Sequence, residues 1–79
     1  MNTVDRMTRK GLQRAIESGA TDFSDLSFRG EDLSGMDLSN LDFRRADFRD
    51  CNLTGTNMHG CSLVGVKWEG ATRTGKTST

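Results

Sequence analysis

Large apolar side chains recur at every fifth residue through most of the chain. The series contains only Phe, Leu, Met and Trp. Its members are, in order, Phe23, Phe28, Leu33, Leu38, Phe43, Phe48, Leu53, Met58, Leu63 and Trp68. A period of five fits neither an α-helix, which repeats near 3.6 residues, nor a strand, which alternates with period two. The chain is therefore predicted to turn a corner in each repeat.

The other positions of the repeat have preferences of their own. The residue before each large apolar one is Asp, Asn or Ser, except at Lys67, and these side chains favour tight bends. The residue two before it is mostly small or apolar, as at Ala46, Cys51 and Val66, and six glycines share a fourth position. Two inward and three outward residues per repeat predict a β-solenoid, stabilised by stacking each coil on the next.

These repeats resemble those of the pentapeptide-repeat family, whose pattern is close to Ala-Asp/Asn-Leu/Phe-X-X. Residues 45–49, Arg-Ala-Asp-Phe-Arg, carry a near-ideal copy, and the resemblance covers residues 21–70. It implies an all-β fold, a right-handed quadrilateral β-helix with four repeats per coil, and thus about two and a half coils. Residue n then stacks on residue n+20, which predicts a column of Phe28, Phe48 and Trp68. Glu31 departs from the pattern, and its face is predicted to open so that it reaches solvent.

A capping helix is predicted before the first repeat, over residues 4–18. Its apolar face consists of Val4, Met7, Leu12, Ala15 and Ile16. Asp5 suits the first turn and Gly19 a left-handed stop, while Gly11 makes a break an alternative. The single domain of residues 1–79 thus divides into a capping segment (1–20), a repeat β-helix (21–70) and a polar tail (71–79) that we expect to be mobile.

The opposite end of the solenoid has no lid that the sequence reveals. The last coil presents four apolar side chains, and the next inward position is Arg73. An uncovered apolar end is typical of an interaction site, and a two-fold axis would let two copies cover each other. A homodimer is therefore predicted, with cover by residues 71–79 or by a partner protein as the alternatives. The predicted dimer interface consists of Leu53, Met58, Leu63 and Trp68.

Composition narrows the class of protein. Only 33% of the 79 residues are apolar, and the formal net charge is zero. Residues 21–70 hold nine acidic and five basic residues, whereas residues 1–20 hold four basic and two acidic ones. No apolar run approaches the length of a membrane span or a signal-peptide core. We therefore expect a cytoplasmic protein that does not bind membranes.

Three patterns suggest chemistry, but none is predicted to provide it. Residues 70–77 match the phosphate-binding P-loop, yet too few residues follow for the helix that such a loop requires. Cys51 and Cys61 are predicted to point inward as buried thiols and His59 outward, so no metal site forms. The regularly spaced acidic residues are predicted to hold corners. We therefore expect no enzymatic activity, no cofactor and no catalytic residues.

Outward arginines are the most distinctive feature of the predicted surface. They are Arg29, Arg44, Arg45 and Arg49. One interpretation is a binding patch for an acidic partner. The other is a solvated face on which Asp25, Asp47 and Asp50 neutralise the arginines, as is usual for surface charges.

The sequence favours a non-enzymatic protein-interaction module: a scaffold, or a modulator of a host enzyme of the kind that a phage or mobile element targets. The resemblance supplies an alternative, because some members of that family resemble duplex DNA in shape and charge and bind type II topoisomerases such as gyrase in its place. The small acidic excess of residues 21–70 makes such mimicry weak. Direct nucleic-acid binding is a second alternative, disfavoured because no aromatic residue is predicted to point outward.

Overall fold

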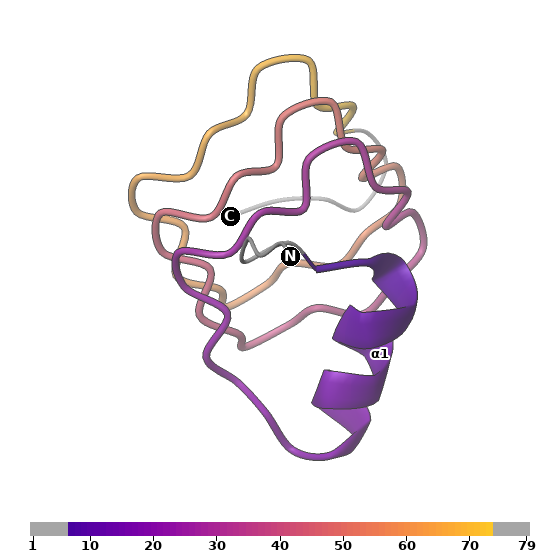
Figure 1. The fold of residues 1–79 in the computed structure, drawn as a ribbon, viewed down its shortest axis with the longest axis vertical. Helices are drawn as coiled ribbons and strands as arrows, with labels where there is room; N and C mark the ends of the chain where they lie inside the picture. The colour runs from indigo at the N-terminus through magenta and orange to yellow at the C-terminus, as the bar shows by residue number, and fades with distance from the viewer. Residues whose placement is uncertain (1–6, 74–79) are drawn as a thin grey trace, which may run out of the picture.

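The computed structural model of the chain describes residues 7–73. Helix α1, Arg9–Glu17, comes first, and from residue 21 onward the chain winds into stacked coils. Figure 1 shows the successive coils as nested traces that run from purple to yellow, with α1 beside them. No helix within residues 7–73 is both long enough and apolar enough to cross a membrane.

Each coil contains twenty residues. Isolated parallel bridges join residues that lie twenty positions apart, as between Asp22 and Asp42 and between Asp42 and Ser62. The N–H of Phe23 donates to the carbonyl of Asp42 at 2.7 Å, and the N–H of Asp42 donates to the carbonyl of Thr21 at 2.8 Å. These bonds confirm the predicted n+20 register. Each bridge is one residue long, so the described residues contain no extended strand, because every repeat turns a corner on either side of it.

The corners are tight turns through a residue with positive φ. After Phe28, for example, the N–H of Glu31 donates to the carbonyl of Phe28 at 3.0 Å, and Gly30 between them has φ 78°. This combination is that of a type II turn, and it accounts for the glycines that share one position of the repeat. Arg45 has φ 61° at the same position, where a long side chain is uncommon. This backbone conformation of Arg45 was not predicted from the sequence.

The interior holds the predicted apolar columns. Phe28 and Phe48 stack with ring centroids 5.1 Å apart and planes 16° apart, and Phe48 and Trp68 stack at 5.5 Å and 17°. Phe43 meets Phe48 edge to face at 5.2 Å, so neighbouring columns also contact each other. Phe28, Phe43 and Phe48 are fully buried. The aromatic stacking predicted from the n+20 register is confirmed.

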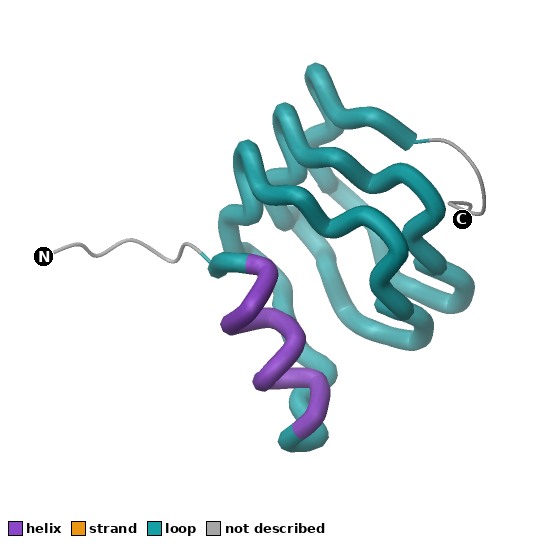
Figure 2. Tube along the Cα trace, turned by 90° about the vertical axis from the view of Figure 1, so that its right-hand side faces the viewer, coloured by secondary structure: helices purple, strands orange, loops and turns teal. Residues whose placement is uncertain are grey.

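Helix α1 lies beside the first coil, at one end of the stack of coils (Figure 2). Its Leu12 is fully buried in the core, and Ala15 and Ile16 pack against that core. Thr8 caps the helix by accepting a hydrogen bond from the N–H of Gly11 at 3.1 Å, and Gly19 follows with φ 98° as predicted. Gly11 does not break the helix. The predicted start was too early, because Met7 and Thr8 are not helical.

Glu31 corrects one prediction about the first coil. Its carboxylate does not simply reach solvent: Oε1 accepts a hydrogen bond from the N–H of Arg9, at the start of α1, at 3.0 Å. Arg9 Nη1 in turn donates to the carbonyl of Asp32 at 2.9 Å. An acidic side chain suits this place because helix N-termini carry unpaired N–H groups and partial positive charge. The repeat that contains Glu31 thus anchors the helix. Val4 and Asp5, which were predicted to belong to the helix, lie outside the described residues.

At the other end the coil continues beyond residue 70, past the predicted boundary. The N–H of Leu53 donates to the carbonyl of Thr72 at 2.7 Å, and the N–H of Thr72 donates to the carbonyl of Cys51 at 2.9 Å. Residues 71–73 of the predicted tail therefore extend the repeat geometry. Residues 74–79 lie outside the described part of the chain, as does the second half of the P-loop match at residues 70–77.

Candidate interaction surfaces

From Asp22 to Asn57, the side chain at each bridge position holds its corner by accepting a hydrogen bond from the N–H two residues on. Asp37 shows the arrangement, because its Oδ1 accepts from the N–H of Ser39 at 3.1 Å and from the Ser39 hydroxyl at 2.7 Å. Asn57 does the same for the N–H of His59 at 3.0 Å. These hydrogen bonds lower the pKa of Asp37, so it remains ionised at neutral pH. The acidic residues have the structural corner role predicted for them.

Two of the predicted patch arginines lie on one corner. The Arg44 Nη2 atom is 2.8 Å from Asp42 Oδ2, and its Nε is 3.0 Å from Oδ1, so one carboxylate holds the whole guanidinium fork. Arg45 reaches across to the preceding coil, where Nε is 2.6 Å from Asp25 Oδ1. Such two-point pairs fix the orientation of the guanidinium more firmly than a single contact does.

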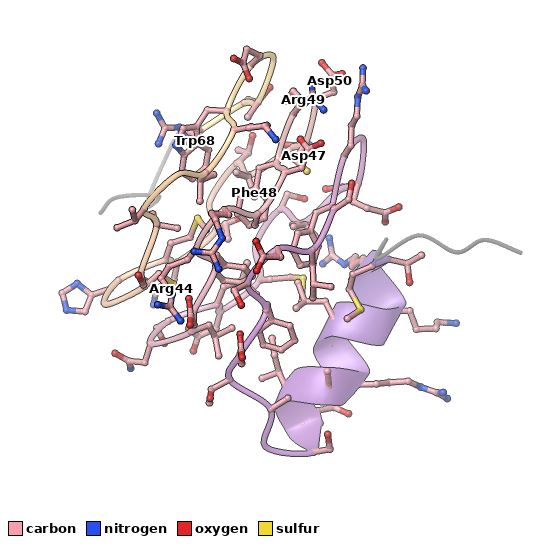
Figure 3. All side chains as sticks on the ribbon, turned by 60° about the vertical axis from the view of Figure 1, so that its left-hand side comes forward. Arg44, Asp47, Phe48, Arg49, Asp50 and Trp68 are labelled. Carbon is pink, nitrogen blue, oxygen red and sulfur yellow. The ribbon has the colours of Figure 1, made fainter. Side chains whose placement is uncertain are left out.

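The other two arginines lie on the next corner. Arg49 Nη2 is 2.8 Å from Asp47 Oδ2, and Arg29 Nε is 3.6 Å from Asp50 Oδ2. Hydrogen bonds from Arg49 are the main cause that lowers the pKa of Asp47 to about 2. Figure 3 shows Arg49 and Asp50 on the outside of the molecule, away from Arg44, while Phe48 lies in the interior and Trp68 at the last coil.

The predicted arginine patch is thus two corners, not one cluster of free positive charge. Every one of its four members pairs with an aspartate, and three of these aspartates are those named in the solvated-face interpretation. The pairing of Arg44 with Asp42 was missed, although their spacing of two residues equals that of Arg49 and Asp47. The n+20 register would have predicted the pair of Arg45 and Asp25.

The terminal coil is less open than the sequence suggested. Leu53 and Met58 are fully buried within the chain, so they offer no surface to a dimer, and this part of the predicted interface is wrong. Leu63 and Trp68 are half-buried. The Arg73 guanidinium lies 4.2 Å from the Trp68 ring centroid, where the next ring of the column would lie. This cation–π contact covers part of the end that was expected to be bare.

The most exposed apolar side chain among residues 7–73 lies on this coil. Val64 has 72% of its surface exposed. Val64 occupies the same corner position as Arg44, one coil later. Its neighbour Leu63 is half-buried. The last coil therefore carries a small apolar corner, formed by Leu63 and Val64, in addition to the partly covered Trp68.

The cysteines are packing residues whose thiols donate hydrogen bonds to the backbone. Cys51 Sγ donates to the carbonyl of Phe28 at 2.7 Å, and Cys61 Sγ donates to the carbonyl of Leu38 at 2.9 Å. Burial raises the pKa of Cys51 to about 11 and also raises that of Cys61. Both are free thiols, and no group of metal-binding side chains gathers within residues 7–73. His59 is exposed, as predicted.

A groove separates α1 from the first coil. Its volume is about 420 Å³. The helix contributes Arg9, Gln13, Ile16 and Glu17, and the coil contributes Gly35, Met36 and Asp37. This groove was not predicted from the sequence, because it depends on how far the helix lies from the coil.

Comparison with known proteins bears on the repeats. The family model for pentapeptide repeats matches the chain in eight copies, over residues 20–55 and 32–65. Together these matches span more than half of the 79 residues. Comparison with curated proteins returns no match.

Proposed function

Because the chain belongs to the pentapeptide-repeat family, we propose that it is a non-enzymatic module that binds another protein through the outer corners of its coils. The family is known for interaction roles and is generally not enzymatic. We infer the family's right-handed quadrilateral β-helix as the form of the coils. The proposal is for a scaffold or modulator, and it leaves the identity of the partner open.

The observation that carries the proposal is the state of the four corner arginines. Each is held by an aspartate, yet between 36% and 58% of its side-chain surface stays exposed. A guanidinium whose orientation is already fixed loses little conformational entropy when a partner contacts it. Alternating positive and negative groups on two adjacent corners suit a partner of complementary pattern, since charge complementarity favours specificity.

Charge reversal at one residue of each corner tests the proposal. The chain is used as bait for the proteins of its native host, and the recovered partner is titrated against purified variants. Arg45→Glu together with Arg49→Glu should weaken binding by a few kcal/mol at most. Lys10→Glu, on the exposed face of α1, is the control. Equal affinity of wild type and the double variant, with both folded by thermal melting, contradicts the proposal.

DNA mimicry receives less support than protein scaffolding. DNA presents negative charge in continuous rows along its axis. One stack of bridge residues along the axis of these coils consists of Asp22, Asp42 and Ser62. Arg44 pairs with Asp42 in this stack, and Ser62 carries no charge. Asp37 is followed by uncharged Asn57. We therefore expect no inhibition when the chain is added to a gyrase supercoiling assay; inhibition at micromolar concentration would favour mimicry instead.

A further inference from the structure

The first coil has an unpaired backbone edge beside α1. In the second coil, the N–H of Asn57 donates to the carbonyl of Met36 at 2.9 Å, and the carbonyl of Asn57 accepts from the N–H of Leu38 at 2.8 Å. Asp37 holds the same place one coil earlier. Within residues 7–73 its own N–H and carbonyl have no hydrogen-bond partner. A coil before the first would have supplied those partners.

The helix supplies a substitute on one neighbouring face only. The carbonyl of Asp32, which is equivalent to that of Asp37 one repeat earlier, accepts from the Arg9 side chain at 2.9 Å. Asp37 instead lines the groove of about 420 Å³, and no side chain of α1 donates to its carbonyl. Ile16 and Met36 provide apolar surface there, while Glu17 and Asp37 provide two negative charges against the single positive charge of Arg9. Asp37 is also exposed as a residue.

We propose that this groove binds an extended segment of another protein, one that carries a Lys or Arg and pairs its backbone with Asp37 as a partial extra coil. Addition of a strand to an exposed edge draws affinity from main-chain hydrogen bonds and specificity from alternate side chains. An apolar side chain of the segment contacts Ile16 and Met36. A basic side chain lies near Glu17, since Arg9 on the same helix is already engaged by Asp32.

This surface is distinct from the arginine corners, so the two proposals fail separately. Its ligand is a basic segment, whereas the arginine corners suit a partner with acidic groups. Arg45→Glu with Arg49→Glu should therefore leave binding in the groove unchanged. Two other occupants, residues 1–6 of this chain and a second copy of it, are outcomes that the experiment distinguishes.

The experiment uses the full chain and a labelled seven-residue probe of sequence Thr-Val-Lys-Val-Lys-Val-Thr. Binding is followed by fluorescence anisotropy and by amide NMR. We expect shifts at the backbone of residues 35–39 and at α1, together with slower hydrogen exchange of the Asp37 amide. A probe with alternate N-methylated amides should lose binding, because it lacks the donors that pair with the carbonyl of Asp37.

Glu17→Lys should weaken binding of the probe about tenfold, which corresponds to ~1.4 kcal/mol. Glu69→Lys makes the same charge change at an exposed residue of the last coil and should have no effect. Equal affinity for the N-methylated probe, equal affinity of Glu17→Lys, or shifts confined to the last coil would overturn the proposal. If residues 1–6 fill the groove, the probe should bind only after these residues are deleted. If a second copy of the chain fills it, the probe should bind only when the protein is diluted. Either result would also overturn the proposal.

Discussion

Single residues at the corners decide whether successive coils can approach. Asn40 and Gly60 both have positive φ and lie at the same corner in successive coils, and a Cβ added to Gly60 would collide with the Asn40 side-chain oxygen. Gly55 has the same backbone conformation, with φ 71°, but open space around it. At this corner, the Asn40 side chain in one coil is thus matched by the absence of a side chain at Gly60 in the next.

The pair of glycines separates backbone strain from this contact. Gly55→Ala should cost about 1 kcal/mol, the usual penalty for a left-handed residue with a Cβ. Gly60→Ala should cost more, because Asn40 must also move. Urea denaturation measures both variants, and Asn40→Gly in the Gly60→Ala background should remove the excess. Equal costs for the two single variants would show that the coils do not approach closely at Asn40.

The pH dependence of stability tests the corner ion pair of Asp47 and Arg49. The pKa of Asp47 in the folded chain is about 2, against 3.8 without these contacts. A carboxyl with a lowered folded pKa stabilises the fold above pH 3.8, and this contribution is lost as the pH falls towards 2. The melting temperature of Asp47→Asn should therefore fall less between pH 5 and pH 2 than that of the wild type. Parallel melting curves for the two proteins would contradict the pairing.

At the scale of elements, the repeats could be predicted from the sequence and the helix only in part. The period of five and the n+20 register follow from local chemistry, so the aromatic columns were predicted. The start of α1 was missed although Thr8 is a local N-cap residue, whereas the hydrogen bond that the Arg9 N–H donates to Glu31 depends on a residue distant in sequence. The contact of Arg73 with Trp68 was missed for a similar reason, since it depends on the coil continuing to Thr72.

The anchoring of α1 by Glu31 can be tested directly. Glu31→Ala removes the acceptor of the Arg9 N–H and should lower stability by about 1 kcal/mol, as loss of a helix cap does. Amide hydrogen exchange in α1 should accelerate with it. Glu17→Ala, at the last residue of the same helix, is the control and should leave exchange at the helix start unchanged. Unchanged exchange in Glu31→Ala would mean that packing of Leu12 alone holds the helix.

At the scale of the whole molecule, one column of rings connects the coils. Phe48 is covered on both faces, by Phe28 and by Trp68, whereas Phe23 stacks on Phe43 alone. Phe48→Ala should cost about 3–5 kcal/mol, which is comparable to the total stability of a small domain. Phe23→Ala should cost less. Thermal melting that places Phe48→Ala within a few degrees of wild type would contradict the importance of the column.

The terminal coil leads to the prediction of a homodimer, with an interface that differs from the one the sequence suggested. Leu53 and Met58 are buried, so the surface available consists of Leu63, Val64 and Trp68. An apolar corner beside a partly covered Trp is an area that a two-fold axis would bury twice. We expect sedimentation equilibrium at micromolar concentration to give the mass of a dimer.

Substitution at Val64 tests this interface without disturbing the core. Val64 is largely exposed, so Val64→Glu should leave the melting temperature of the monomer unchanged while placing two like charges across the two-fold axis. The variant should sediment as a monomer. His59→Glu, at the exposed corner one repeat earlier, should remain a dimer. A monomeric wild-type chain, whose Trp68 fluorescence does not change on dilution, would rule out the dimer, and a dimeric Val64→Glu would place the interface elsewhere.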